Sequence, residues 1–141
     1  MKVLIDTCVV IDALQNRKPF NEDAEAVFLS VANRKCASFI TAKASTDIYY
    51  MMHRAFHSVN KTKNALEIIF ALFEIIDTSG MDCRKALASE ITDYEDAVMV
   101  ESAVRSGIDC IITRNLKHFA GSPLPVYSPG EFLKLIYGSD V

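Results

Sequence analysis

The sequence contains few of the residues on which several common kinds of binding site depend. It has no tryptophan, and its five glycines are not clustered. A phosphate-binding loop needs neighbouring glycines so that the backbone can wrap around phosphate, which argues against a nucleotide-binding protein of that class. The four cysteines are scattered without a Cys-x-x-Cys pair, and none of the three histidines has zinc-ligand spacing to a cysteine. A zinc knuckle is therefore disfavoured.

Long apolar runs are also absent, and no stretch could cross a bilayer. The chain begins MKVLID, so that Asp6 stands where a signal peptide would continue its apolar region. We therefore expect a cytoplasmic protein that has no membrane segment and keeps its cysteines as reduced thiols among apolar neighbours.

The net charge of −3 argues against a protein that holds nucleic acid by overall positive charge. It does not argue against a nuclease, because acidic residues that bind a metal ion contribute to this total. Half of the 141 residues are apolar and 23% are charged, as in ordinary globular proteins. The length and composition predict a single domain over residues 1–141.

Apolar runs of strand length alternate with amphipathic stretches along the whole chain. We expect strands at 3–6, 36–40, 75–77, 109–113 and 125–127. Helices are expected at 7–16, 22–34, 42–56, 61–73, 80–89, 93–106 and 129–137. This alternation predicts an α/β fold with three layers, α/β/α, around a central and mostly parallel sheet.

Helix starts are marked by residues whose side chains accept hydrogen bonds from free backbone amides. Asn21, Thr41 and Asn60 are the expected N-caps of three helices. Two further helices are expected to begin with capping boxes at Thr92–Glu95 and Ser128–Glu131.

Polar residues follow two of the expected strands directly. Asp6 comes after Val3-Leu4-Ile5, and Thr113-Arg114-Asn115 comes after another apolar run. The carboxyl ends of parallel strands share one edge of the sheet, where ligands bind. Asp6 can act as the N-cap of the next helix, as a metal ligand, or as both, because a carboxylate has two oxygens. Arg114 could bind a phosphate through two hydrogen bonds, and Asn115 could offer a neutral oxygen to a cation.

Three more aspartates are candidates for a cluster around a cation. Asp93 and Asp96 lie one turn apart on the same expected helix face, where Asp93 also suits the first turn because of the helix dipole. Asp96 is followed by small apolar residues, an unfavourable setting for an isolated carboxylate, so we favour a functional role. Asp47 is either a surface residue paired with Arg54 or a functional acid. For Asp12 a solvated or ion-paired position is expected.

Five segments, taken together, resemble the PIN-domain family of small metal-dependent nucleases, which includes the VapC-like toxins. The resemblance extends over nearly the whole chain and is most specific at Asp93-Tyr94-Glu95-Asp96-Ala97. The other segments are Val3-Leu4-Ile5-Asp6-Thr7, Thr46-Asp47-Ile48-Tyr49-Tyr50, Ile111-Ile112-Thr113-Arg114-Asn115-Leu116-Lys117-His118-Phe119 and Tyr127-Ser128-Pro129-Gly130-Glu131-Phe132.

The resemblance implies an acidic cluster of Asp6, Asp47 and Asp96 that holds Mg²⁺ or Mn²⁺ for catalysis. Asp93 would support this cluster or ligate the ion directly. The sequence departs from the family pattern at two positions. Asp47 replaces the more frequent and longer Glu. Asn115 stands where the family often has Asp, and it is expected to be a weak ligand that lowers the affinity of a second cation site.

The implied activity is hydrolysis of phosphodiester bonds in single-stranded RNA. Thr7, Thr113 and Arg114 are expected to contact the substrate, and His118 to lie near it. The resemblance also implies an antitoxin protein as partner, and a homodimer.

Two other functions are compatible with part of the sequence. A phosphatase with an aspartyl nucleophile would need a second Asp two residues after Asp6, where the chain has Cys8. The stronger alternative is a non-catalytic module on the same fold that binds RNA or protein, because fold alone does not establish activity. Asn115 favours this alternative.

Overall fold

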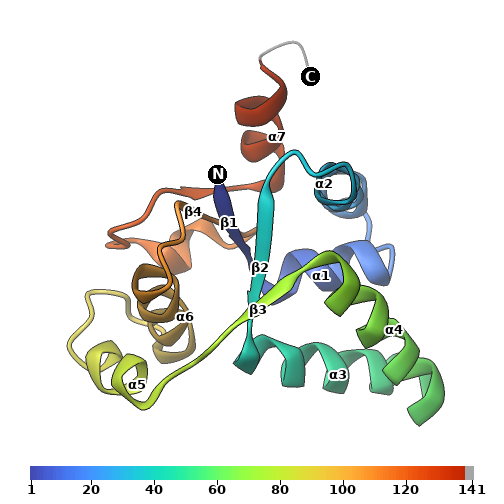
Figure 1. Cartoon of the computed structure of the whole chain (residues 1–141), viewed down its shortest axis with the longest axis horizontal. Coiled ribbons are helices and arrows are strands. Elements are labelled where there is room, and N and C mark those ends of the chain that lie inside the picture. Colours follow the sequence, from blue (N-terminus) through green and yellow to red (C-terminus); the bar gives the residue numbers. More distant parts are fainter. Residues whose placement is uncertain (139–141) are drawn as a thin grey trace.

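The computed structural model describes residues 1–138, which form a central sheet with helices on both faces (Figure 1). Within these residues the sheet has five strands in the order β3-β2-β1-β4-β5, and all neighbouring strands are parallel. The strands are β1 (Lys2–Ile5), β2 (Ala37–Thr41), β3 (Glu74–Ile76), β4 (Cys110–Ile112) and β5 (Val126–Tyr127). The predicted three-layer α/β/α fold is confirmed.

Seven α-helices and one short 3₁₀ helix connect the strands of the described part. The helices are α1 (Thr7–Leu14), α2 (Asn21–Ala32), α3 (Ala42–Phe56), α4 (Val59–Leu72), α5 (Gly80–Ala86), α6 (Tyr94–Arg105) and α7 (Pro129–Tyr137). The 3₁₀ helix η1 (Leu116–Phe119) follows β4 and was not predicted. The last three residues of the domain predicted over 1–141 lie outside the described residues.

Strand β1 lies at the centre of the sheet because its side chains are apolar on both faces. Val3 and Ile5 belong to a core formed with α1, α2, α3, α4 and α7. Leu4 points to the opposite face and joins a second core formed mainly with α5 and α6. Alternate side chains of a strand point to opposite faces, so this four-residue strand anchors both helical layers.

The carboxyl ends of β1 and β4 lie side by side. Leu4 is in register with Ile111 and Ile5 with Ile112. The backbone amide of Asp6 continues this pairing by donating to the carbonyl oxygen of Ile112 at 2.9 Å. The first residues after the two strands are therefore neighbours in space although they are far apart in the sequence.

Three of the predicted helix starts were wrong by one or two residues. The N-cap of α2 is Phe20 instead of Asn21, and it makes no side-chain cap bond. The N-cap of α4 is Ser58 instead of Asn60. Helix α6 is capped by Asp93, so the expected capping box at Thr92 does not form. Several neighbouring polar residues are good caps, and local sequence does not decide which of them begins the helix.

Within residues 1–138, no helix has the length and apolar character needed to span a membrane. All four cysteines are free thiols, as predicted. Cys110 is buried and the other three are half-buried, so the expectation of buried thiols is confirmed fully only for Cys110.

Candidate functional site

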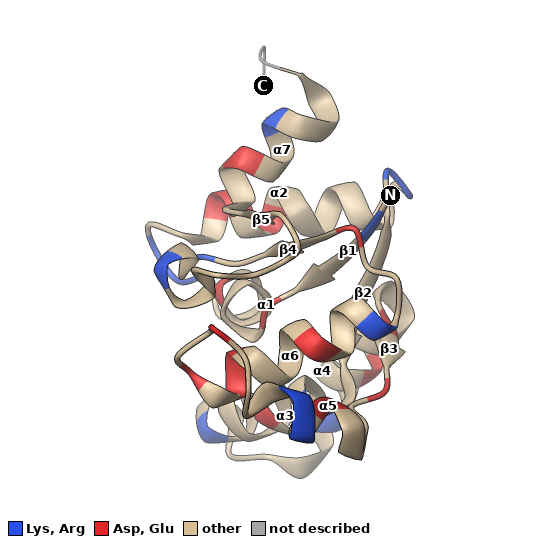
Figure 2. Ribbon diagram, turned by 90° about the vertical axis from the view of Figure 1, so that its left-hand side faces the viewer, with Lys and Arg blue, Asp and Glu red and all other residues tan. Residues whose placement is uncertain are grey.

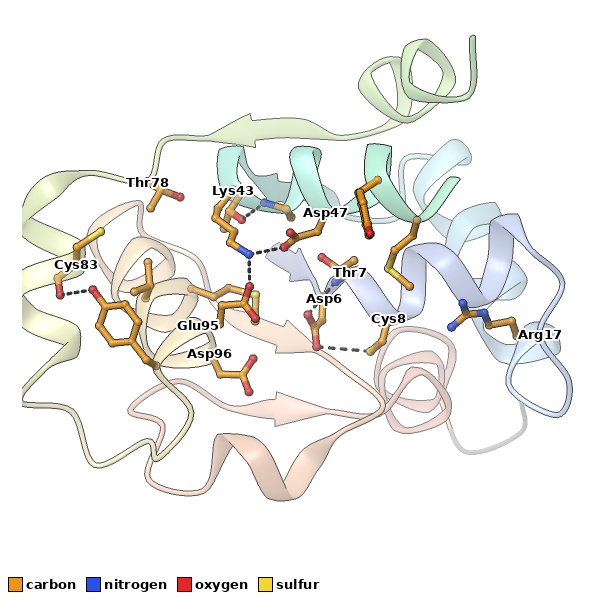
Figure 3. Close-up of a pocket in the computed structure, with 17 residues that line it drawn as sticks. Asp6, Thr7, Cys8, Arg17, Lys43, Asp47, Thr78, Cys83, Glu95 and Asp96 are labelled. Atoms are coloured by element: carbon orange, nitrogen blue, oxygen red, sulfur yellow. Dashed lines mark hydrogen bonds and ion pairs between the residues drawn. The ribbon is translucent and has the colours of Figure 1, made fainter. Parts of the chain in front are cut away.

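A cavity of about 650 Å³ lies beyond the carboxyl ends of β1 and β2 (Figure 3). Its walls come from α1 and the segment that follows it, from α3 and α6, and from the segment between β3 and α5 together with the start of α5. Asp6, Asp47 and Asp96, the three predicted catalytic residues, all line this cavity, as does the predicted substrate contact Thr7. The fold thus brings together three carboxylates that are remote in sequence.

Asp6 is held at the sheet edge by hydrogen bonds from neutral groups. Its Oδ1 accepts from the backbone amide of Thr7 at 2.8 Å, which makes Asp6 the N-cap of α1. Its Oδ2 accepts from the hydroxyl of Thr113 at 2.8 Å and from the thiol of Cys8 at 3.5 Å. Burial raises the pKa of Asp6 even though these bonds act in the opposite direction. Asp6 is therefore both a helix cap and a cavity carboxylate.

Asp96 lies in the first turn of α6, with only 19% of its side chain exposed. The preceding Asp93 is the N-cap of the helix, and its Oδ1 accepts from the amide of Asp96 at 3.0 Å. Burial, followed by the negative charges of Asp6 and Asp93, raises the pKa of Asp96 to about 6. His118 offsets part of this effect, since its Nδ1 lies 3.6 Å from Asp96 Oδ2. Asp6 and Asp96 are thus close enough to repel each other.

Asp47 has a basic partner at the solvent-exposed wall of the cavity. Lys43, one turn earlier on α3, donates to Asp47 Oδ2 at 2.6 Å and also to Glu95 on α6 (Figure 3). The ion pair between Asp47 and Arg54, which the sequence offered as an alternative, does not form. The Arg54 guanidinium lies over the Tyr50 ring instead. Partial burial acts to lower the pKa of Lys43. The hydrogen bonds and charges of the two carboxylates outweigh this effect, so the pKa is raised.

Thr113 and Arg114, the two other predicted substrate contacts, make hydrogen bonds within the protein. The side chain of Thr113 is fully buried and orients Asp6. The guanidinium of Arg114 donates to Asp12 at 2.8 Å and 3.2 Å and lies over the ring of Phe20, 4.1 Å from its centroid. Asp12 is 1% exposed, so the ion pair expected for it is found in the interior. The pair fastens the segment after β4 to α1.

Two predicted cation ligands do not line the cavity. Asn115 donates its backbone amide to the hydroxyl of Thr113 at 3.0 Å, and Asp93 is exposed as the helix cap. The sequence did not identify Lys43 and Glu95 as cavity residues. Each lies near a predicted helix start, and that position was the only sign of a role. Their 52-residue separation hid their contact.

A sequence model of the PIN domain matches residues 2–117. The chain belongs to the PIN domain family. The match includes every residue that we have placed at the cavity. A comparison with curated proteins finds no significant match.

Solved structures similar to this PIN domain confirm the fold. The toxin–antitoxin complex from Klebsiella pneumoniae is 25% identical with a TM-score of 0.67, covering 90% of this chain and 97% of that one. DNA-bound VapBC from Salmonella typhimurium is 18% identical with a TM-score of 0.68, covering 92% and 98%. The sarcin–ricin-loop-cleaving toxin VapC20 of Mycobacterium tuberculosis is 11% identical with a TM-score of 0.61, covering 77% and 86%.

The donor atoms at the cavity suit a hard divalent cation. Within residues 1–138, no group of three or more His, Cys, Asp or Glu side chains is close enough to form a complete metal cage. Mg²⁺ does not need such a cage, because it commonly binds through one or two carboxylates and keeps water or phosphate as its remaining ligands. Asp6 and Asp96 fit this description, since they repel each other and a cation would remove that repulsion.

Proposed function

We propose that this PIN domain is a ribonuclease that depends on Mg²⁺ or Mn²⁺ and cleaves single-stranded RNA. The observation that carries the proposal is the placement of Asp6 and Asp96 in one cavity, where burial and the negative charge of Asp6 both disfavour the charged form of Asp96. In the described residues Asp6 has hydrogen bonds only from neutral donors, so its charge is available to an added cation.

A bound divalent cation would withdraw charge from the phosphate and lower the pKa of a water molecule. The protein's own part is to hold the carboxylates. Thr113 and the amide of Thr7 fix both oxygens of Asp6, and Asp93 fixes the helix turn that carries Asp96. His118, with 58% of its side chain exposed beside Asp96, lies where it can meet the negative charge of a phosphate. Asp47 and Asp93 add negative charge near the ion.

Single-stranded RNA is the substrate that best suits a recessed site of this kind. An unpaired strand can place one phosphate in the cavity without unstacking a helix. The toxin VapC20 of Mycobacterium tuberculosis, which shares this fold, is described as cleaving the sarcin–ricin loop, and this supports RNA over DNA.

We further propose that the protein is the toxin of a toxin–antitoxin pair that acts in the cytoplasm as a single PIN domain and forms a homodimer. Its support is that similar structures from Klebsiella pneumoniae and Salmonella typhimurium are toxin–antitoxin complexes. Copurification with the product of a neighbouring gene would test the antitoxin, and light scattering would test the dimer.

The first experiment measures thermal melting with and without Mn²⁺. Mass action predicts that saturating Mn²⁺ raises the melting temperature of the parent by about 5 °C. Asp96→Asn should abolish this rise because it removes one of the two carboxylates. An unchanged melting temperature of the parent would favour the alternative, a non-catalytic RNA- or protein-binding module.

The second experiment measures cleavage of a single-stranded RNA. Asp6→Asn should reduce the rate about 100-fold or more, because the cation loses a ligand while the Asn oxygen can still cap α1. Asp23→Asn is a matched control, because it removes the same charge from a residue of α2 that lies outside the cavity. Equal rates for the parent and Asp6→Asn would remove Asp6 from the mechanism.

A further inference from the structure

Lys43 joins the two sides of the cavity through its ammonium group. It lies in the first turn of α3 and donates to Asp47 on the same helix and to Glu95 on α6 (Figure 3). Figure 2 shows acidic positions around α3 and α6 with basic positions interspersed among them. One positive charge therefore serves two carboxylates that come from different helices.

Helix physics does not explain a lysine at this place. The amino-terminal turn of a helix carries partial positive charge and disfavours cations. A lysine followed by an acid four residues later is also the less favourable order for a helical ion pair. Both effects act against Lys43 at the start of α3, so its position depends on the contacts that it makes across the cavity.

The cavity is lined by four carboxylates, and two of them share the single positive charge of Lys43. Asp47 and Glu95 share its ammonium, whereas Asp6 and Asp96 raise the local negative potential without a lysine or arginine hydrogen-bonded to them. A divalent cation that enters the cavity meets one pair of acids that attracts it and another pair whose charge is already partly balanced.

We propose that Lys43 is a positioning residue whose ammonium acts as a built-in cation at Asp47 and Glu95, and thereby directs a single divalent ion to Asp6 and Asp96. This inference rests on the proposed function, because it assumes that the cavity binds such an ion.

The test is isothermal titration of Mn²⁺ into the full chain. Lys43→Met removes the ammonium but keeps an unbranched side chain of similar length. It should tighten Mn²⁺ binding about fivefold, because Asp47 and Glu95 become free to attract the ion and a nearby positive charge is lost. Lys43→Arg should keep the affinity of the parent, because a guanidinium can serve the same two carboxylates.

A triple variant, Lys43→Met with Asp47→Asn and Glu95→Gln, separates a local effect from a general one. Its affinity should return to within about twofold of the parent if Lys43 acts through these two acids. The matched control is Lys63→Met, which removes the same charge from the exposed surface of α4, outside the cavity. It should leave Mn²⁺ binding unchanged, and circular dichroism would confirm that each variant is folded.

The outcomes distinguish this inference from the function on which it rests. If the parent binds no Mn²⁺, the proposed function fails and the inference fails with it. If the parent binds Mn²⁺ but Lys43→Met binds it equally or more weakly, the cavity remains a metal site and only the role of Lys43 is overturned. Equal tightening by Lys63→Met would also overturn it, because net charge alone would then explain the effect.

Discussion

The aspartates of this PIN domain fall into two groups according to whether an arginine accompanies them. Asp12 and Asp82 are each 1% exposed and bind the guanidinium groups of Arg114 and Arg105. Asp6 is also largely enclosed, yet it accepts hydrogen bonds only from neutral groups in the described part. Burial is therefore compatible with two different uses of the same side chain.

The pKa of Asp82 is shifted in the opposite direction from the pKa values of Asp6 and Asp96. Hydrogen bonds from Arg105 hold the pKa of Asp82 well below its usual range, although burial acts in the opposite direction. Burial raises the pKa of Asp6, and burial together with neighbouring acids raises that of Asp96. An internal arginine stabilises the charged form of Asp82, whereas Asp6 and Asp96 have no arginine and their charged forms would gain from a bound cation.

The largest effect on stability is expected from separating the buried pair of Asp12 and Arg114. Arg114→Met leaves the Asp12 carboxylate buried without its cation, and should lower the free energy of unfolding by about 2 kcal/mol after allowance for partial solvent screening. Urea unfolding at neutral pH measures this loss. Asp12→Asn in the same chain should recover most of it. If Arg114→Met leaves stability intact and weakens RNA binding alone, Arg114 contacts substrate, as the sequence predicts.

A smaller loss is expected for the second pair, because much of Arg105 remains in water. Asp82→Asn removes the charge that Arg105, Ser102 and the amide of Ser79 all bind. It should lower the free energy of unfolding by roughly half as much as Arg114→Met does.

Asp6→Asn should not destabilise the metal-free protein, since it removes a carboxylate whose burial is unfavourable. Urea titrations of both variants would measure their free energies of unfolding. A lower value for Asp6→Asn than for Asp82→Asn would contradict this comparison.

The smallest effect is the pH dependence of the Asp82 contribution. Because the folded state lowers the pKa of Asp82, its charge stabilises the fold above the ordinary pKa of about 4. That contribution is lost as the pH falls through the lowered value. The stability difference between the parent and Asp82→Asn should therefore be constant from about pH 7 to pH 5 and shrink below about pH 4. A difference that grew on acidification would reverse the assignment.

Much of the fold could be predicted because it depends on local patterns. Val3-Leu4-Ile5 can only be a strand buried on both faces, and Asp6 directly after it suits both the end of that strand and the start of a helix. The exact helix starts were less predictable, since Thr92 and Asp93 are both good caps and packing selects Asp93.

The partners of the charged residues could not be predicted in the same way. Asp12 and Arg114 are 102 residues apart, Lys43 and Glu95 are 52 apart, and Asp82 and Arg105 are 23 apart. Nothing in a local pattern states which acid meets which base. For this reason the sequence did not identify Arg114 as the partner of Asp12, and it indicated no role for Lys43.

The sequence by itself determined the order of strands and helices and placed Asp6 at a strand end, because burial periodicity and capping act over a few neighbouring residues. Only the tertiary structure decided which carboxylates are satisfied by internal cations and which remain free at the cavity. The physical reason is that electrostatic pairing depends on distance and burial in space, and the parallel sheet creates those by joining segments that the chain keeps far apart.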